Sequence, residues 1–432
     1  MGILIKDALA VLPDGAGHAT GRHDIYVDGT DIVGIDEAPQ GFVCSQTIDA
    51  SNRLAIPGLI NAHTHTYMSM MRNVADDLSF ADWLFGTIEP IEDRLEPEDA
   101  YWASLLSQIE MIKSGTTCFN DMQMHIGQTT RAVRESGMRA VICRGLVGDA
   151  DDIEQGDYRK DFRIDEALRE RSDYADCDRL TFRLGPHAPY SCTQSYLRLV
   201  ADVAHEYGMG IHIHIAESQT ETDNMWADHH CTPVEYVRDA GIFDVPTIAA
   251  HCIRVSESDR AILAENGVSV VTNPASNMKL GNGFAPVPEL MEAGINVCLG
   301  TDGAASNNAQ NMFREMSLLA LIHKGTHDVP QCVSADETLA MATRNAARAL
   351  DLPTGSIEVG KKADLVLLDL DAPSLTPLNN AVAALSYSAN GSEVTDVIID
   401  GKVVLQDRTL LTIDEERVRH EIARICTRLG LA

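Results

Sequence analysis

Two histidines, His63 and His65, lie one residue apart at the end of an apolar run in this 432-residue chain. In a β-strand, residues i and i+2 project from the same face, so both imidazoles can face one ion. That spacing is typical of the first two ligands of a Zn²⁺ site. Ordinary polar positions also show it, so a metal site requires further ligands from elsewhere in the chain.

Polar residues also end most of the other predicted strands. Barrel enzymes carry their catalytic groups at the carboxyl ends of the strands. The residues at these ends are Asp121, Arg144, His187, His214, Glu217, His251, Asn273 and Asp302.

We expect His214 and Asp302 to complete the ligand set. His212 is an alternative ligand, but His214 is preferred because Glu217 follows three residues later, where a carboxylate can reach water on the metal. His212 then lies deeper in the barrel. Asp302 follows an apolar run, so its carboxylate emerges at the strand end; capping the next helix is the alternative role.

Three imidazoles and one carboxylate leave an open coordination position for water. A divalent cation there lowers the pKa of water from about 15.7 to about 7. Asp302 and His251 can accept hydrogen bonds from this water, and Glu217 can carry its proton to a leaving amine. The fourth strand ends in LGPHAPY, without the lysine or acid that a two-metal site needs. One Zn²⁺ per subunit is expected, with Fe²⁺, Mn²⁺ or Ni²⁺ as substitutes.

The middle of the chain alternates strand-like runs with amphipathic stretches, such as residues 98–115 with Gly115 at the helix C-terminus. Eight such units predict an α/β fold, a (β/α)₈ TIM barrel over residues 57–354. The strand candidates are residues 53–63, 116–121, 139–147, 180–186, 208–217, 247–252, 268–274 and 296–302.

The two segments that flank the predicted barrel have a different pattern of predicted elements. Each contains alternating strands around an Asp-Gly turn, at residues 28–29 and 400–401. Their matching character predicts that residues 1–56 and 355–432 join into one small composite β-sandwich domain. Chain termini are often neighbours in space, which makes this closure easy.

Charge and composition restrict the partners. With 34 basic and 64 acidic residues the formal net charge is −30, so nucleic acid and anionic membranes are not expected partners. The acidic surface is consistent with adaptation to salt or with drift. The ten cysteines form no CxxC motif and read as reduced and mostly buried.

The sequence carries no sign of a membrane segment or a targeting signal. No run of about 18 apolar residues is present. The N-terminus lacks the pattern of a signal peptide, and Lys6 stands where a myristoylation signal has Ser or Thr. We expect a cytoplasmic protein. Whether it forms a homo-oligomer is left open.

Taken together, these motifs resemble the mononuclear branch of the amidohydrolase superfamily over essentially the whole chain. The matching segments are PGLINAHTH, HIAE, AAHC, LGTDGAAS and GSIEVGKKADLVLLD. Within that branch the chain is similar to the S-adenosylhomocysteine/5′-methylthioadenosine deaminases and their chlorohydrolase relatives. The finer matches are VADDLSFADWLF, PIEDRL, RGLV, GPHAPY and NPASNMKLGNGFAPVPELMEAG.

The resemblance implies a role for each matched residue. Zinc is held by His63, His65, His214 and Asp302, and Glu217 and His251 move protons. Glu92 binds the two ribose hydroxyls, and His187 hydrogen-bonds a purine nitrogen. Arg144 meets a carboxylate or polar 5′ group, and Trp83 walls the pocket, which His214 also faces. The plainer alternatives are a surface charge for Glu92, a structural ion pair for Arg144 and packing for Trp83.

Some segments depart from the family pattern. Tyr67 and Asn73 stand where these deaminases commonly have smaller residues, and SQTETDN follows HIAE. In the acidic segment 148–175, Arg159 and Arg163 are the candidates for a second carboxylate-binding arginine. If neither arginine binds a substrate carboxylate, a substrate with an uncharged 5′ group is favoured.

The leading hypothesis is a zinc-dependent aminohydrolase that converts an adenosine derivative to the inosine derivative and ammonia. The substrate would be 5′-methylthioadenosine, S-adenosylhomocysteine, 5′-deoxyadenosine or adenosine. One alternative is a deaminase or chlorohydrolase of guanine or an s-triazine. Another is an inactive barrel that serves as a binding protein.

Overall fold

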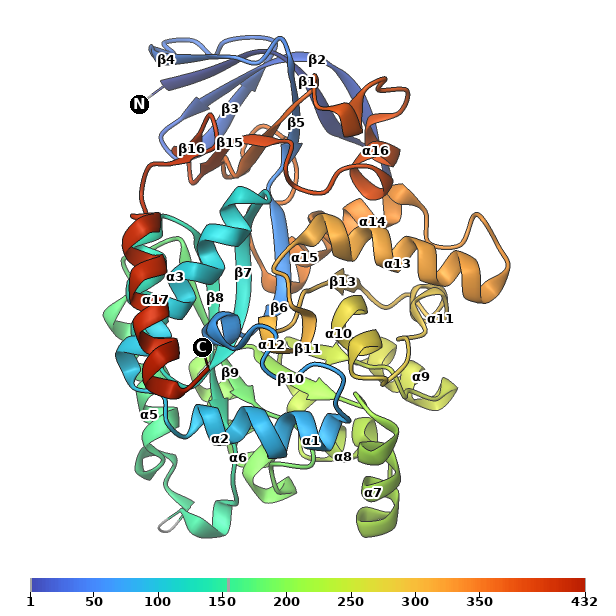
Figure 1. Ribbon diagram of the computed structural model, residues 1–432. Helices are drawn as coiled ribbons and strands as arrows, with labels where there is room; N and C mark the ends of the chain where they lie inside the picture. Colours follow the sequence, from blue (N-terminus) through green and yellow to red (C-terminus); the bar gives the residue numbers. More distant parts are fainter. Residues whose placement is uncertain (1, 154–155, 432) are drawn as a thin grey trace.

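The computed structural model describes residues 2–153 and 156–431. Residues 154 and 155, within the acidic segment singled out above, lie outside the described residues. Figure 1 shows a barrel with a separate sheet packed at one end.

The predicted (β/α)₈ barrel is confirmed. Eight strands form one parallel sheet in chain order, and each lies within one of the eight runs chosen from the sequence, or within two residues of it. Buried apolar side chains line nearly every strand, as expected of a parallel sheet covered by helices. The strands are β6 (Leu59–Thr64), β7 (Thr116–Gln123), β8 (Arg139–Leu146), β9 (Leu180–Pro186), β10 (Ile211–Ile215), β11 (Thr247–His251), β12 (Ser269–Thr272) and β13 (Val297–Leu299).

Hydrogen bonds between the ends of β6 and β13 close the ring. The Asp302 amide donates to the His63 carbonyl at 2.9 Å. Just below, the Asn61 amide nitrogen donates to Thr301 Oγ1 at 2.7 Å, and the Thr301 amide donates to Asn61 Oδ1 at 2.9 Å. Two expected metal ligands therefore sit at the seam of the barrel.

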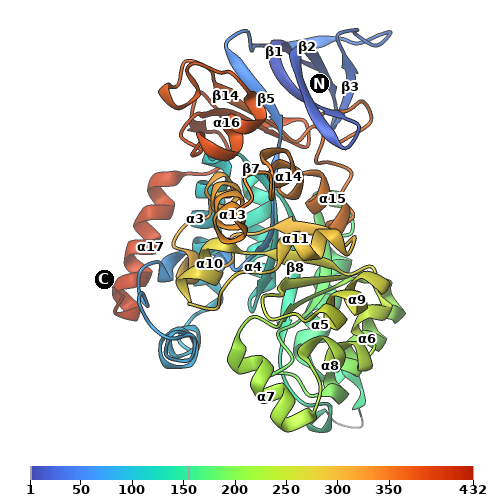
Figure 2. The ribbon, with the colours of Figure 1, turned by 90° about the vertical axis from the view of Figure 1, so that its right-hand side faces the viewer.

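Helices cover the outside of the barrel (Figure 2). The predicted helix over residues 98–115 is α3, which ends as expected before Gly115, whose φ is +82°. Helix α3 spans Pro97–Lys113. The barrel helices that follow are α4 (Ile126–Ser136), α5 (Phe162–Asp173), α6 (Gln194–Tyr207), α7 (Gln219–His229), α8 (Pro233–Asp239), α9 (Glu257–Glu265), α10 (Pro274–Lys279), α11 (Val287–Glu292), α12 (Ala304–Asn307), α13 (Met312–His327), α14 (Ala335–Met341) and α15 (Arg344–Leu350).

The segment between β6 and α3 crosses the open end of the barrel. It contains α1 (Phe80–Trp83), the π-helical turn Leu84–Ile88 and α2 (Glu89–Glu92). In Figure 1 these short helices lie at the end of the barrel far from the second sheet. They bring Trp83 and Glu92 over the carboxyl ends of the strands.

The flanking segments do form one second sheet of nine strands. β5 joins them, because it pairs in parallel with β1 and antiparallel with β14. Both predicted Asp-Gly hairpins are present, between β2 and β3 and between β15 and β16. The strands are β1 (Gly2–Asp14), β2 (Gly17–Asp28), β3 (Asp31–Ile35), β4 (Cys44–Asp49), β5 (Arg53–Pro57), β14 (Leu365–Asp369), β15 (Val394–Ile399), β16 (Lys402–Gln406) and β17 (Thr409–Leu410).

One strand differs from the sequence-based expectation. The run 53–63, chosen as one strand, divides at Gly58 into β5 of the second sheet and β6 of the barrel. A Cβ at Gly58 would lie 2.1 Å from Thr117 Oγ1, so the crossing requires glycine. The last helix, α17 (Glu415–Leu429), lies beside α3 of the barrel (Figure 1), where Lys113 pairs with Glu415.

The predicted domain boundaries at 56/57 and 354/355 stay a prediction. Between the two sheets, the buried Arg139 guanidinium of β8 donates to Asp364 at 2.8 Å and to Asp400 at 3.0 Å. Among the described residues, no helix is both long and apolar enough to cross a membrane.

Candidate active site

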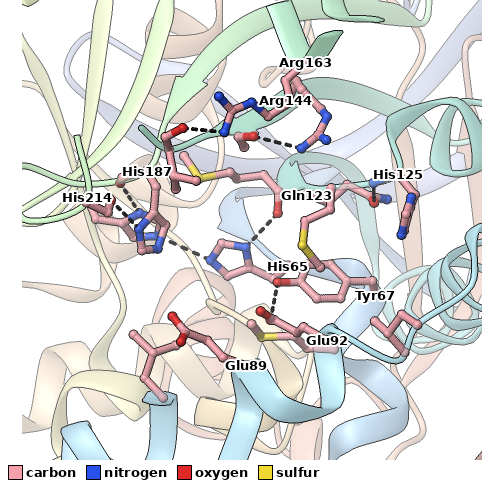
Figure 3. Close-up of a pocket in the computed structure, with 18 of the residues that line it drawn as sticks. His65, Tyr67, Glu89, Glu92, Gln123, His125, Arg144, Arg163, His187 and His214 are labelled. Carbon is pink, nitrogen blue, oxygen red and sulfur yellow. Dashed lines mark hydrogen bonds between the residues drawn. The ribbon is translucent and has the colours of Figure 1, made fainter. Parts of the chain in front are cut away.

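Three of the predicted ligand histidines meet at the carboxyl ends of β6 and β10. One ring nitrogen each of His63, His65 and His214 lies within 4.8 Å of the others. The Nε2 atoms of His65 and His214 are 3.3 Å apart. In Figure 3 these two rings point toward one another inside the cavity.

The fourth predicted ligand, Asp302, faces the same point. Its Oδ1 atom lies 3.3 Å from His63 Nε2 and 3.4 Å from His65 Nε2. Its Oδ2 atom instead accepts hydrogen bonds from the hydroxyls of Ser276 and Ser306, at 2.6 and 2.8 Å. The two serines thereby turn Oδ1 toward the histidines.

Hydrogen bonds fix which nitrogen each imidazole offers. His65 Nδ1 donates to the Met122 carbonyl at 2.7 Å, and His214 Nδ1 donates to the His187 carbonyl at 2.6 Å. A proton on Nδ1 leaves a lone pair on Nε2, which is what a metal ligand needs. Burial lowers the pKa of His63 to about 4 and that of His214 well below its ordinary value, so both rings are neutral.

These donors fit a divalent metal ion. Within the described residues, His63 Nε2 is fully buried and makes no hydrogen bond, although buried polar atoms are normally paired. This nitrogen, one nitrogen each from His65 and His214, and one carboxylate oxygen of Asp302 are the ligand types that Zn²⁺ prefers.

His212 lies one layer deeper, as expected. Its Nε2 atom is 2.9 Å from His63 Nδ1, on the side of the His63 ring that faces away from the cluster. The Asn120 amide is 3.1 Å from His212 Nδ1. His212 therefore contacts a candidate ligand instead of facing the common point of the other three rings.

Glu217 and His251 stand beside the cluster. His251 Nε2 lies 3.8 Å from Glu217 Oε2, and a ring nitrogen of His251 lies within 4.8 Å of His63 and Asp302. Burial, together with the charge of Asp302, raises the pKa of Glu217 well above its ordinary value. A carboxyl group with a raised pKa can both take up and release a proton near neutral pH.

A cavity of about 970 Å³ opens above the cluster. His65, His214, Glu217, His251 and Asp302 all line it. His187 forms part of the wall, with Ser191 Oγ 2.9 Å from its Nδ1, and desolvation lowers its pKa to about 4.

The segment that crosses the barrel mouth supplies the opposite wall. In Figure 3, Glu92 and Glu89 face the histidines across the cavity. Burial raises the pKa of Glu92, whose Oε1 accepts a hydrogen bond from Tyr67 at 2.6 Å. Trp83 lines the cavity and also donates from Nε1 to the Ala305 carbonyl at 3.3 Å, so it serves both wall and packing.

Arg144 and Arg163 lie together at one end of the cavity (Figure 3). Arg144 is buried, and its Nε donates to Glu166 at 2.7 Å. Arg163 also lines the cavity, but its Nε and Nη2 both donate to Asp161, at 2.8 and 2.7 Å. Arg159 is exposed, pairs with Asp157 and does not line the cavity.

The structure adds residues that the sequence did not single out. Glu89, Tyr190 and Gln123 line the cavity. The Asn282 amide donates to Glu217 Oε1 at 3.3 Å. Asn282 lies between two glycines in a segment noted for its family resemblance, and that flanking was its only signal in the sequence.

Together the barrel and its histidine–aspartate cluster define a metal-dependent hydrolase. The chain belongs to the amidohydrolase family, which matches residues 54–404. The family resemblance seen in the sequence is thereby confirmed.

Two curated relatives match almost end to end. A "5-methylthioadenosine/S-adenosylhomocysteine deaminase" of Caldanaerobacter subterraneus subsp. tengcongensis is 45% identical over 404 residues, 93% of this chain and 92% of the relative. A protein of the same name from Thermoanaerobacter pseudethanolicus is 43% identical over 427 residues, 98% of both chains.

Solved structures agree with this assignment. An adenosine deaminase from Xanthomonas campestris with bound zinc superposes with a TM-score of 0.92 at 31% identity, covering 100% of this chain and 99% of the other. An atrazine chlorohydrolase from Arthrobacter aurescens, complexed with zinc, has a TM-score of 0.90 at 24% identity, covering 98% and 99%. The second likeness establishes only the shared fold.

Proposed function

We propose that this chain is an aminohydrolase that removes the 6-amino group of an adenosine derivative, with one zinc ion per chain. The observation that carries the proposal is the meeting of four metal-type donors with Glu217 and His251 on the floor of one cavity. The names of the relatives support the substrate class.

His63, His65, His214 and Asp302 would hold the metal. When bound, a divalent cation lowers the pKa of water to about 7 and so supplies hydroxide at neutral pH. The protein's own contribution is to fix these four side chains through His212, the Met122 and His187 carbonyls, and the Ser276 and Ser306 hydroxyls.

Glu217 and His251 would handle the protons. Hydrolysis moves both protons of the attacking water: one goes to the ring nitrogen and stays there, and the other leaves the new hydroxyl for the amine, which departs as ammonia. Glu217 lies beside the cluster with a raised pKa, so one carboxyl group can perform both transfers. His251, 3.8 Å away, can accept a hydrogen bond from the water and orient it.

The walls would orient the nucleoside. A neutral His187 can hydrogen-bond a purine nitrogen, and Glu92 can accept from both hydroxyls of a cis-diol. Tyr67 donates to one Glu92 oxygen, which restricts how that carboxylate turns. Trp83 supplies an apolar surface for a ring.

The paired arginines support a substrate with an uncharged 5′ group. Arg144 is engaged by Glu166, and Arg163 is engaged at two nitrogens by Asp161. A substrate carboxylate would compete with an internal carboxylate for either one. Methylthioadenosine, 5′-deoxyadenosine or adenosine therefore fits this end of the cavity better than adenosylhomocysteine.

A substrate panel tests the proposal. The absorbance change of deamination is followed with adenosine, 5′-deoxyadenosine, methylthioadenosine, adenosylhomocysteine, guanine and an s-triazine. We expect the highest kcat/KM for an adenosine derivative with an uncharged 5′ group. Higher kcat/KM for guanine or the triazine would overturn the proposal, and a preference for adenosylhomocysteine would overturn the assignment of the 5′ group.

A further inference from the structure

We propose that Asn282 is a positioning residue for the deamination, because it holds one oxygen of Glu217 and leaves the other free to move protons. The inference rests on the role proposed above for Glu217.

The two carboxyl oxygens of Glu217 have different partners. Oε1 accepts the hydrogen bond from Asn282 Nδ2 at 3.3 Å, while Oε2 faces His251 Nε2 at 3.8 Å. Both Glu217 and Asn282 are 6% exposed, so water does not compete freely for the contact. A neutral amide donates a hydrogen bond but takes up no proton near neutral pH. The contact therefore distinguishes the two oxygens and directs Oε2 toward the reaction.

The backbone under Glu217 is fixed as well. The buried Glu221 side chain accepts from the Ala216 amide at 3.0 Å and from the Glu217 amide at 2.7 Å. Ala216 has a φ of +53°, a conformation that costs free energy for a residue with a side chain. Two hydrogen bonds to one carboxylate stabilise this turn, so what remains adjustable is the side chain of Glu217.

The loop that carries Asn282 is tied back to the same turn. The Arg254 amide donates to the Ala216 carbonyl at 2.9 Å, and its Nη2 donates to the Asn282 carbonyl at 2.6 Å. The guanidinium packs on Gly283, where a Cβ would lie 3.2 Å from Nη2. Ala216, Arg254, Asn282 and Glu217 thus form a closed ring of contacts.

The test begins with the zinc-loaded wild-type protein and three single variants. Asn282→Ala removes the amide, and Asn282→Asp replaces it with a carboxylate of the same shape. Asn266→Ala is the control, because the exposed Asn266 amide donates only to the helix carbonyl of Ile262. We expect Asn282→Ala to lower kcat by about tenfold to a hundredfold, since small misplacements of a reacting group have effects of this size. KM should stay within about threefold.

The pH profile separates positioning from a structural role. Losing a donor, or gaining a neighbouring carboxylate, raises the pKa of Glu217. The acid limb of the kcat profile should therefore move to higher pH in Asn282→Ala, and further in Asn282→Asp. Melting temperature and zinc content should match the wild type. If the wild type is active and the Asn282 variants have the same kcat and pH profile, the role of Asn282 is wrong but the proposed function stands. If the wild type itself is inactive, the proposed function is wrong.

Arg254 supplies a second, independent measurement. Its Nη2 donates to the Asn282 carbonyl, so Arg254→Ala should lower kcat in the wild-type background and have little further effect in Asn282→Ala. Arg260→Ala is the matched control, because Arg260 donates to the Val255 carbonyl on the same segment. Full additivity of the two changes, a rise in KM with kcat unchanged, or an unmoved acid limb would each overturn the proposal.

Discussion

The imidazoles of His65 and His214 each have one nitrogen fixed by a backbone carbonyl and the other aimed at the cluster. Asp302 has one oxygen held by two serines and one free. The site is thus organised by hydrogen bonds to neighbouring carbonyl and hydroxyl groups. Glu217 follows the same pattern, with Oε1 held by Asn282 and Oε2 directed at His251.

At the residue scale, Glu92 distinguishes a nucleoside from a plain heterocycle. Glu92→Ala should raise KM for methylthioadenosine on the order of tenfold to a hundredfold, since each hydrogen bond to a charged group contributes about 1.5–3 kcal/mol. KM for guanine, which has no ribose, should change little. Steady-state kinetics with both compounds check this, and equal losses for the two would contradict the assignment.

The sequence predicted the residues at the strand ends because hydrophobic periodicity reveals strands and barrels place chemistry where strands end. It could not predict which side chains pair across the cavity. The hydrogen-bonded partners Tyr67 and Glu92 are 25 residues apart in the sequence, and Arg144 and Glu166 are 22 apart. Asn282 and Glu217 are separated by 65 residues. Such contacts depend on the folded geometry of several loops.

At the scale of elements, buried ion pairs of one arginine join the barrel to the second sheet, and hydrogen bonds to a buried carboxyl group link helices of the barrel. The Arg139 guanidinium joins β8 to Asp364 and Asp400. Glu315 of α13 accepts from the Ala275 amide at 3.0 Å and from Asn307 at 2.9 Å, which ties α13 to α10 and α12.

Arg139→Met should be strongly destabilising. It leaves two buried carboxylates without their partner, and breaking such a pair costs about 3–5 kcal/mol. Arg419→Met is the control, because Arg419 pairs with Glu415 on an exposed helix face and should shift stability by less than about 1 kcal/mol. Urea midpoints measure both variants. Equal midpoints would show that the contacts of Arg139 contribute no net stability to the folded chain.

Glu315 should make stability depend on pH. Burial raises its pKa from 4.5 to about 7 in the folded chain, so between those values the folded state binds more proton than the unfolded state. The contribution of Glu315 to stability is therefore fully present below pH 4.5 and declines as pH rises toward 7. Glu315→Gln should lose less stability relative to wild type at pH 8 than at pH 5. Thermal melts at both pH values test this prediction. A larger loss of stability in Glu315→Gln at pH 8 than at pH 5 would contradict it.

At the scale of the whole molecule, the candidate metal site lies at the seam where the barrel closes. His63 and His65 end β6, His214 lies on β10 and Asp302 follows β13. A metal there would link the first and last strands as well as the middle of the barrel.

Metal removal should therefore lower both activity and stability. A ligand that binds only the folded state, at a hundred to a thousand times its Kd, stabilises it by about 2.7–4.1 kcal/mol. Dialysis against a chelator should lower Tm, and added Zn²⁺ should restore both Tm and turnover. A Tm that does not respond to the chelator would argue against a metal bridging these strands.

The most direct test of the central claim compares wild type with Glu217→Gln in zinc content and turnover of methylthioadenosine. Glutamine keeps the shape of the side chain but cannot carry a proton, so kcat should fall by about a hundredfold to ten-thousandfold. One zinc per chain should remain in both proteins. Full activity in Glu217→Gln, or an active wild type without any transition metal, would contradict the account.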